Sequence, residues 1–337
     1  MSYSALLLQR LAIARAAEQG APLYVSGAAL AADFNVTRSA IWKAIGQLRA
    51  LGTEIEAITH RGYRLALPVS PLTTAGVMAR LTPGARAKLR EGRCEAQLDS
   101  TNSALLARGM PPTGGFDFLT AEYQSAGRGR RGRSWLAPPG GAVCLSWSWN
   151  FAGLATQLGA LSLAVGVAVL RALSSLGCAG IQLKWPNDLV TARGKLGGIL
   201  IEIRSEAAGP VHVVVGLGLN VALGRLARAG ISELGNAATD LAELQGEART
   251  PAREVLVAAL LEHGVAAMEE FARSGLASFA AEYRAADALA DRMVRIEGGN
   301  DPVDGTARGI DDDGALKIEH GGKIHRIIAG EVSVRGA

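Results

Sequence analysis

Apolar positions recur with helical spacing at the start of the chain. Leu7 and Leu11 lie one helical turn apart and predict a first helix there. Ser26 and Thr37 precede two further stretches with helical spacing, and both residues are favourable N-terminal caps. We therefore predict a short helix after Ser26 and another over Arg38–Ala50, separated by a tight turn. This arrangement is typical of a helix-turn-helix.

Two short alternating segments follow these helices. Ile55–Ile58 and Tyr63–Leu65 flank a polar turn over Thr59–Gly62, which predicts a two-stranded wing. The first 67 residues hold seven cations and four anions, a net charge of +3. We predict a winged helix-turn-helix DNA-binding domain over residues 1–67; a small helical domain that contacts other proteins is the alternative. The residues expected at the DNA are Thr37, Arg38, Ser39, Trp42, Lys43 and Arg61.

Strand and helix patterns alternate after a linker at Pro68–Pro71. Strands are expected over Phe118–Glu122, Val143–Trp149, Ile181–Lys184, Leu196–Ile203 and Val211–Leu219, and helices over Leu154–Leu176, Pro251–Arg273 and Ser278–Ala285. The longest near-apolar run, Leu158–Leu170, is shorter than the roughly 20 residues that span a bilayer, so we predict a buried helix. The pattern indicates an α/β domain around a mixed sheet over residues 68–285.

From about residue 286 the chain changes to short strands broken by glycine and aspartate. Short strands of this kind predict a small β-barrel over residues 286–337. The predicted fold class is therefore α+β and multidomain, with a winged helix first, an α/β domain in the centre and a barrel at the end.

Composition narrows the function classes further. Apolar residues make up 49% and charged residues 20% of the 337 residues, which excludes a disordered or low-complexity protein. Three scattered cysteines are too few for a disulfide framework or a zinc site, and the N-terminus does not look like a signal peptide. We expect a cytoplasmic protein with no membrane partner. Only six of the 35 cations are lysines, which singles out Lys184 and Lys195 beside two dense motifs.

The densest motif is a loop with three glycines and four arginines inside Glu122–Trp135. Its glycines match G-x-G-x-x-G, but the following Pro138 and Pro139 prevent the helix that a dinucleotide fingerprint requires. Such a loop can surround an anion with backbone N–H groups and guanidinium groups. An arginine patch for RNA or DNA is the alternative, and Gln124 between the strand and the loop favours a small polar ligand.

A second block runs K-W-P-N-D-L from Lys184, turns at Thr191–Gly194 and continues as K-L-G-G-I-L-I-E from Lys195. We expect the turn to join two strands and to bring the two lysines onto neighbouring strands. Gly197 and Gly198 weaken a strand interior, so we expect a ligand or another backbone to approach there. Two weaker motifs are the polar run D-S-T-N-S at residues 99–103, at a turn into a helix, and the strand V-V-V-G-L-G-L-N-V at residues 213–221.

These motifs, in the order in which they occur along the chain, closely resemble those of the biotin–protein ligases. With the N-terminal winged helix, the chain resembles the bifunctional ligases that also repress the biotin operon. The resemblance implies an adenylate-forming reaction that yields biotinyl-5′-AMP and pyrophosphate from biotin and ATP. The biotin then passes to one lysine of the biotin carboxyl carrier protein of acetyl-CoA carboxylase. It also implies a central ligase domain and an SH3-like C-terminal barrel.

The resemblance assigns site residues as follows. Biotin would be held by Ser100, Thr101, Asn102, Gln124, Arg128, Gly129, Arg130 and Lys195. ATP and the adenylate would be held by Arg130, Arg133, Trp135, Lys184, Asp188 and Asn220, with Lys195 and Arg130 as the catalytic residues. No metal site made by the protein alone is expected, although Asp188 can contact Mg²⁺ brought by ATP. The adenine-side loop would fall within Arg225–Glu247, which has little motif content.

The implied partners are the carrier protein, the operator DNA of the biotin synthesis genes, and a second copy of the chain when biotinyl-AMP is bound. Trp42 is bulky for the middle of a recognition helix, so the operator sequence does not follow from the family. Two alternatives are a ligase whose winged helix no longer represses and a non-catalytic biotin sensor. The complete arginine loop and Lys195 argue against the sensor.

Overall fold

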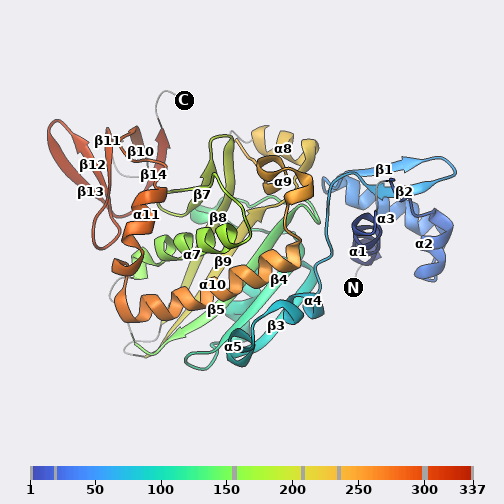
Figure 1. Ribbon diagram of the computed structural model, residues 1–337, viewed down its shortest axis with the longest axis horizontal. Coiled ribbons are helices and arrows are strands. Elements are labelled where there is room, and N and C mark those ends of the chain that lie inside the picture. Colours follow the sequence, from blue (N-terminus) through green and yellow to red (C-terminus); the bar gives the residue numbers. More distant parts are fainter. Residues whose placement is uncertain are drawn as a thin grey trace.

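The computed structural model describes residues 3–18, 21–153, 158–205, 209–233, 237–297 and 303–334. These residues form an N-terminal helical unit, a central sheet covered by helices, and a small C-terminal sheet (Figure 1). The helical unit and the C-terminal sheet lie at opposite ends of the long axis of the molecule (Figure 1).

The N-terminal unit is the predicted winged helix-turn-helix. Its elements are α1 Tyr3–Ala16, α2 Gly27–Asp33, α3 Arg38–Ala50, β1 Ile55–Ile58 and β2 Gly62–Leu65. Ser26 and Thr37 cap α2 and α3 by accepting hydrogen bonds from the backbone N–H groups of Ala29 and Ala40, as predicted. Asn35 has φ 51°, the left-handed conformation that the tight turn between the helices needs. The unit has a hydrophobic core of its own.

A seven-stranded mixed sheet forms the central domain. Its strands are β3 Leu89–Leu98, β4 Phe116–Gln124, β5 Ala142–Phe151, β6 Gln182–Lys184, β7 Asp188–Thr191, β8 Gly194–Ser205 and β9 Val211–Asn220. The order is β3-β4-β5-β9-β8-β7-β6, and the pairing of β3 with β4 is parallel while the other pairings are antiparallel. The predicted mixed sheet is confirmed, although β3 carried no clear strand pattern and was not expected.

Helices cover both faces of this sheet. The α-helices of the central domain are α4 Thr74–Arg80, α5 Pro83–Lys88, α6 Thr101–Arg108, α7 Leu161–Ser175, α8 Gly224–Glu233, α9 Leu241–Gln245, α10 Arg253–Ser274 and α11 Ala280–Ala286. Short 3₁₀ turns lie at Arg130–Gly132, Leu158–Ala160, Glu247–Arg249 and Ala277–Phe279. Helices α7 and α10 cross one face (Figure 1). Alternate strand residues explain the second layer: Phe118 packs into the main core, whereas its neighbour Leu119 packs with Leu105 of α6.

The apolar run that begins at Leu158 is confirmed as a buried helix. Leu158–Ser175 is long and apolar enough to span a membrane, but 61% of it is buried in the fold, where α7 packs against α10. The first residues of the predicted helix, 154–157, lie outside the described part of the chain.

The C-terminal unit is a five-stranded antiparallel sheet in the order β13-β12-β11-β10-β14. Its strands are β10 Met293–Glu297, β11 Val303–Ile310, β12 Leu316–His320, β13 Lys323–Ile327 and β14 Glu331–Val334. Its inward residues, such as Leu316 and Val332, belong to the same core as the central domain. The Trp185 indole N–H also donates to the Gly314 carbonyl across the junction (3.0 Å).

One expected arrangement is wrong. Lys184 and Lys195 do not lie on neighbouring strands, because Lys184 ends β6, Lys195 lies on β8, and β7 runs between them. The prediction took K-W-P-N-D as the end of one strand. The chain instead reverses at Pro186–Asn187, so Lys184 pairs with Asp188.

The winged helix touches the central domain close to the end of the arginine loop. The Thr53 hydroxyl donates to the Pro139 carbonyl (3.1 Å), and the Glu54 carboxylate accepts from the backbone N–H of Arg225 at the start of α8 (2.7 Å). Farther along the linker, Ser70 accepts from the guanidinium and backbone of buried Arg253. The linker is therefore fixed on the central domain.

Candidate functional site

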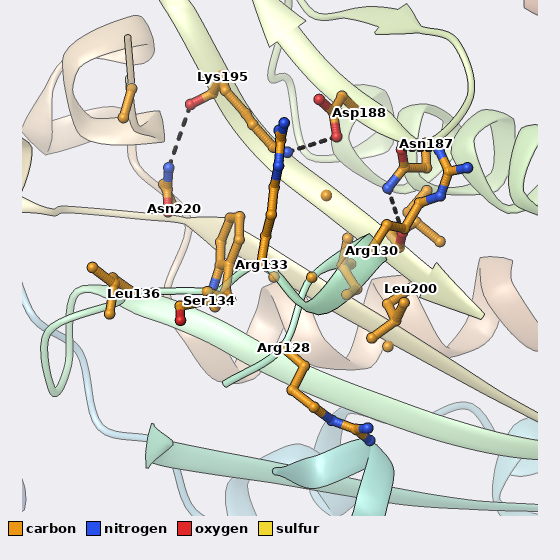
Figure 2. Close-up of a pocket in the computed structure, with 18 of the residues that line it drawn as sticks. Arg128, Arg130, Arg133, Ser134, Leu136, Asn187, Asp188, Lys195, Leu200 and Asn220 are labelled. Atoms are coloured by element: carbon orange, nitrogen blue, oxygen red, sulfur yellow. Dashed lines mark hydrogen bonds and ion pairs between the residues drawn. The ribbon is translucent and has the colours of Figure 1, made fainter. Parts of the chain in front are cut away.

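A cavity of about 260 Å³ opens beside strands β8 and β9 (Figure 2). Every residue that the sequence analysis assigned to biotin or to the nucleotide lines it: Ser100, Thr101, Asn102, Gln124, Arg128, Gly129, Arg130, Arg133, Trp135, Lys184, Asp188, Lys195 and Asn220. These residues come from four separate motifs, so the fold gathers the motifs around one space. Which ligand atom each residue contacts stays a prediction.

One end of the cavity is polar and neutral. Ser100 caps α6, which places Thr101 and Asn102 in its first turn, and all three are at most 4% exposed. Thr101 donates from its backbone N–H to Gln124 Oε1 (2.8 Å), and its hydroxyl oxygen lies 3.1 Å from the same atom. Ser146 on β5 donates to Asn102 Oδ1 (2.6 Å). These donors and acceptors suit a small, uncharged polar ring.

The arginine loop folds back on itself next to this end. The backbone N–H of Trp135 donates to the Gly127 carbonyl (2.8 Å), and the backbone N–H of Gly129 donates to the Arg133 carbonyl (2.7 Å). The loop contains only a single 3₁₀ turn and no α-helix, which bears out the rejection of a dinucleotide fingerprint. Arg130 donates to Asn187 Oδ1 (3.2 Å), so the loop contacts the K-W-P-N-D segment directly (Figure 2).

Lys195 is held in place from both sides. Its ammonium lies 2.6 Å from Asp188 Oδ1, and its backbone pairs with Ala237 and Thr239. Asn220 Nδ2 donates to the carbonyls of Lys195 (3.4 Å) and Thr239 (3.0 Å). The side chain of Lys195 is 35% exposed and points into the cavity, so it is not a freely solvated hairpin charge (Figure 2).

Glycines on β8 and β9 make room for site side chains. A Cβ at Gly216 would lie 2.3 Å from Asn102 Oδ1, and one at Gly218 would lie 2.3 Å from the Trp135 ring. Gly197 lies against the backbone of Gly218, as its predicted close approach requires. Any larger residue at Gly216 or Gly218 would displace a residue that lines the cavity.

Charge is distributed unevenly along the cavity. Its lining cations are Arg128, Arg130, Arg133, Lys184 and Lys195, and Asp188 is the one carboxylate among the lining residues that the structure describes. Such an excess of cations suits a polyanion or a carboxylate. Two buried polar atoms beside these groups, Asn220 Oδ1 and Trp135 Nε1, have no hydrogen-bond partner within the described part of the chain. A ligand with polar groups would satisfy them.

Among the described residues, no group of three or more His, Cys, Asp or Glu could hold a metal ion. Cys144 lies under Trp135 and Gln124, and burial raises the pKa of its thiol to about 12 despite contacts with both residues. A thiolate nucleophile at neutral pH is therefore excluded for Cys144.

Several lining residues were missed. Ile231, Ala237 and Ala238 come from α8 and the segment after it, and Gly330 and Val332 come from the C-terminal unit. The expected adenine-side segment, Arg225–Glu247, thus does reach the cavity, although residues 234–236 within it are outside the described part. These small and apolar residues carry no motif, so only the tertiary fold identifies them.

The expected DNA face lies on the exposed side of α3. Arg38, Ser39, Trp42 and Lys43 are exposed, Trp42 by 70%, while Thr37 serves as the cap. Arg61 at the wing turn stacks on the Tyr24 ring (4.6 Å). Among the described residues, Arg38, Lys43 and Arg61 have no ion-pair partner, whereas Arg10, Arg15 and Arg64 pair within the domain. Their charge therefore remains available to an anionic partner.

The fold and the cavity define an α/β domain with a ligand-binding cavity, joined to an N-terminal winged helix-turn-helix. Models of known protein families match all three units of the chain. Residues 96–220 match the Biotin/lipoate A/B protein ligase family, residues 10–64 match an HTH domain, and residues 291–335 match the Biotin protein ligase C terminal domain.

Relatives of known function cover nearly the whole chain. It is 35% identical over 314 residues to the bifunctional ligase/repressor BirA of Escherichia coli, which covers 93% of both chains. It is 39% identical over 259 residues to the biotin–[acetyl-CoA-carboxylase] ligase of Mycobacterium tuberculosis, covering 74% of this chain and 91% of that one. The biotin protein ligase from Aquifex aeolicus, solved with biotin and ATP, superposes with a TM-score of 0.60 at 25% identity. The match covers 74% of this chain and 100% of that one.

This chain belongs to the biotin protein ligases, in the group of bifunctional ligase/repressors that carry an N-terminal helix-turn-helix domain. The predicted fold class and the predicted ligase class are both confirmed.

Proposed function

We propose that this chain activates biotin with ATP in the cavity and transfers it to a lysine of a biotin carboxyl carrier protein. The observation that carries this proposal is the juxtaposition of a neutral polar end, at Thr101, Asn102 and Gln124, with the cations Arg130 and Lys195 in one cavity. Biotin has a neutral ureido ring at one end and a carboxylate at the other, so both of its ends find matching chemistry.

The proposed reaction has two steps. The biotin carboxylate attacks the α-phosphate of ATP, the bond to the β-phosphate breaks, and pyrophosphate leaves. A carrier lysine amine then attacks the acyl carbonyl of biotinyl-5′-AMP, and AMP leaves. Lys195 and Arg130 would offset the negative charge that develops at the phosphate, and the arginine loop would exclude water from the mixed anhydride.

The nucleotide would lie along Arg133, Trp135, Lys184 and Asn220. The unpartnered Asn220 Oδ1 and Trp135 Nε1 support this placement, because a base and a ribose offer donors and acceptors. Mg²⁺ would arrive with the phosphates and neutralise part of their charge, and Asp188 is the lining carboxylate able to contact it. Biotin-dependent exchange of pyrophosphate into ATP, with lipoate as the control acid, tests the activation step.

We also propose that the winged helix binds the operator of the biotin synthesis genes when two copies associate. A single winged helix makes few phosphate contacts, and two copies related by a dimer axis can reach two half-sites. Dimerisation coupled to bound biotinyl-AMP would make repression depend on the supply of biotin. A protein that needs ATP, a carrier protein and DNA would act in the cytoplasm.

Lys43→Glu should weaken operator binding while leaving ligation unchanged. Lys43 is exposed on α3 and has no ion-pair partner among the described residues, so the substitution places a negative charge against DNA phosphate. For a dimer, the slope of log K against log salt should fall by about 2, one for each lost phosphate contact. Affinity is measured against salt with biotinyl-AMP saturating.

Lys323→Glu is the matched control, because Lys323 is exposed on β13 in the C-terminal unit, at the far end of the molecule from α3 (Figure 1). It should leave both the affinity and the salt slope unchanged. Equal slopes for the wild type and Lys43→Glu would remove Lys43 from the DNA interface.

A further inference from the structure

Glu202 lies on β8 next to the polar end of the cavity, and no role proposed above uses it. Its carboxylate accepts a hydrogen bond from Asn102 Nδ2 (2.8 Å) and lies 3.0 Å from Arg128 Nη2. The side chain is 24% exposed, so the pair with Arg128 is partly shielded from solvent. One carboxylate therefore connects the first arginine of the loop to the first turn of α6.

Together with the Leu200 carbonyl, the carboxylate determines which way the Asn102 amide points. An ionised carboxylate can only accept hydrogen bonds, so Asn102 must direct its NH₂ group toward Glu202 and its oxygen toward Ser146. The observed contacts agree: Nδ2 also donates to the Leu200 carbonyl (3.2 Å), and Oδ1 accepts from Ser146 (2.6 Å). Asn102 is 3% exposed, so its amide has no alternative partner in water.

This direction passes along a chain of buried groups. A hydroxyl has one proton, and Ser146 directs its proton to Asn102. Because that proton is used, the Thr101 hydroxyl, 2.7 Å from Ser146 Oγ, must donate to Ser146, and Gln124 Oε1 accepts from the backbone N–H of Thr101 (2.8 Å). The chain thus runs from the arginine loop across β8, α6 and β5 to the end of β4. Glu202 is the acceptor-only group at its start.

We propose that Glu202 is a positioning residue that sets the hydrogen-bond direction of the polar end for the ureido ring of biotin. It acts through Asn102, and it holds the start of the arginine loop through Arg128. The proposal rests on the function proposed above, in which this end of the cavity receives the ring. A ring that meets a donor where it needs an acceptor leaves both groups unpaired, which weakens binding.

Glu202→Gln tests this directly, because glutamine has the same shape but can present its NH₂ group to Asn102, which removes the stronger of the two acceptors that hold the amide in its direction. Biotin binding to the full-length protein, measured by calorimetry without ATP, should weaken about tenfold. The KM for biotin should rise in the same proportion, while the KM for ATP stays within about twofold. Glu202→Asp, which keeps the charge and the acceptor, should recover part of the affinity.

A second measurement tests the direction of the hydrogen bonds at the polar end of the cavity. In 2-iminobiotin an N–H group replaces the ureido oxygen, so a donor stands where biotin has an acceptor. The wild type should strongly prefer biotin over 2-iminobiotin, and Glu202→Gln should reduce this preference. A purely structural role for Glu202 would weaken both ligands equally and would overturn the proposal.

Two further variants keep the outcome clear. Ser146→Ala breaks the same chain on the other side of Asn102, so it should weaken biotin binding even if Glu202→Gln fails to fold; wild-type affinity would overturn the proposal. Glu282→Gln is the matched control, since Glu282 forms a comparable pair with Arg171 on α7 (2.6 Å) outside the cavity.

Gln124→Ala separates this proposal from the function on which it rests. Weaker biotin binding in Gln124→Ala with unchanged binding in Glu202→Gln would overturn the role of Glu202 alone. Unchanged binding in both variants would place the ring elsewhere and overturn the proposed site together with the role of Glu202.

Discussion

Lys195→Ala is expected to slow biotin-dependent exchange of pyrophosphate into ATP about a hundredfold. Lys195 brings a cation to the end of the cavity where the carboxylate and the α-phosphate would meet, and Asp188, Asn220 and the backbone of Ala237 fix its position. A preorganised charged donor of this kind contributes about 3 kcal/mol to the transition state, or roughly a hundredfold in rate. The loss should appear mainly in kcat, because the charge it offsets is largest in the transition state.

Lys88→Ala is the control for this experiment. Lys88 also pairs with a carboxylate, that of Glu269, and does not line the cavity. Its substitution should leave the exchange rate unchanged. A near-normal rate in Lys195→Ala would mean that Lys195 serves only to pair with Asp188.

Arg130→Gly is expected to release biotinyl-AMP about ten to a hundred times faster than the wild type. Arg130 joins the arginine loop to Asn187, and it would also contact the phosphate of the adenylate. A hydrogen bond from a charged group contributes about 1.5–3 kcal/mol, and its loss changes a dissociation rate by the corresponding factor. Adenylation itself should survive in part, because Lys195 remains.

The released adenylate should then acylate exposed lysines of any protein nearby. Mass spectrometry of a mixture of the carrier protein and an unrelated lysine-rich protein would detect this. The wild type should label the carrier alone, whereas Arg130→Gly should label both. Labelling that stays confined to the carrier lysine in the variant would contradict the assigned role of the loop.

Much of the fold follows from local sequence signals. The caps at Ser26 and Thr37, the tight turn between the helices and the alternating wing strands are local, and each is found as predicted. Strand β3 is different because its burial alternates weakly along Leu89–Leu98, and its strand conformation depends on pairing with β4. Long-range pairing leaves little trace in a single sequence.

The site also combines residues that local sequence motifs identify with contacts that only the tertiary fold creates. Motif residues such as Gln124 and Lys195 were identified because their neighbours in sequence are unusual, and they line the cavity. Glu202 belongs to a motif, but its partner Asn102 lies 100 residues away, so the sequence alone does not pair them. The reversal of the chain at Pro186 and Asn187 separated the two lysines by a whole strand. Ile231 contributes only an apolar surface, which no motif marks.

The bifunctional proposal joins two units that contact each other where the arginine loop ends. Thr53 meets Pro139 there, and Glu54 meets the first turn of α8, whose later residue Ile231 lines the cavity. Helix α8 therefore contacts the winged helix at its first turn and lines the cavity farther along. This contact gives a physical route by which bound biotinyl-AMP could affect DNA binding.

An electrophoretic mobility shift with the promoter of the organism's own biotin synthesis genes tests the bifunctional proposal most directly. The full-length protein is titrated with no ligand, with biotin alone, with ATP alone and with both. We expect a shifted complex at low protein concentration only when biotin and ATP are both present, and Lys43→Glu should require more protein. Binding that is absent in all four mixtures, or equal in all four, would contradict a repressor controlled by biotinyl-AMP.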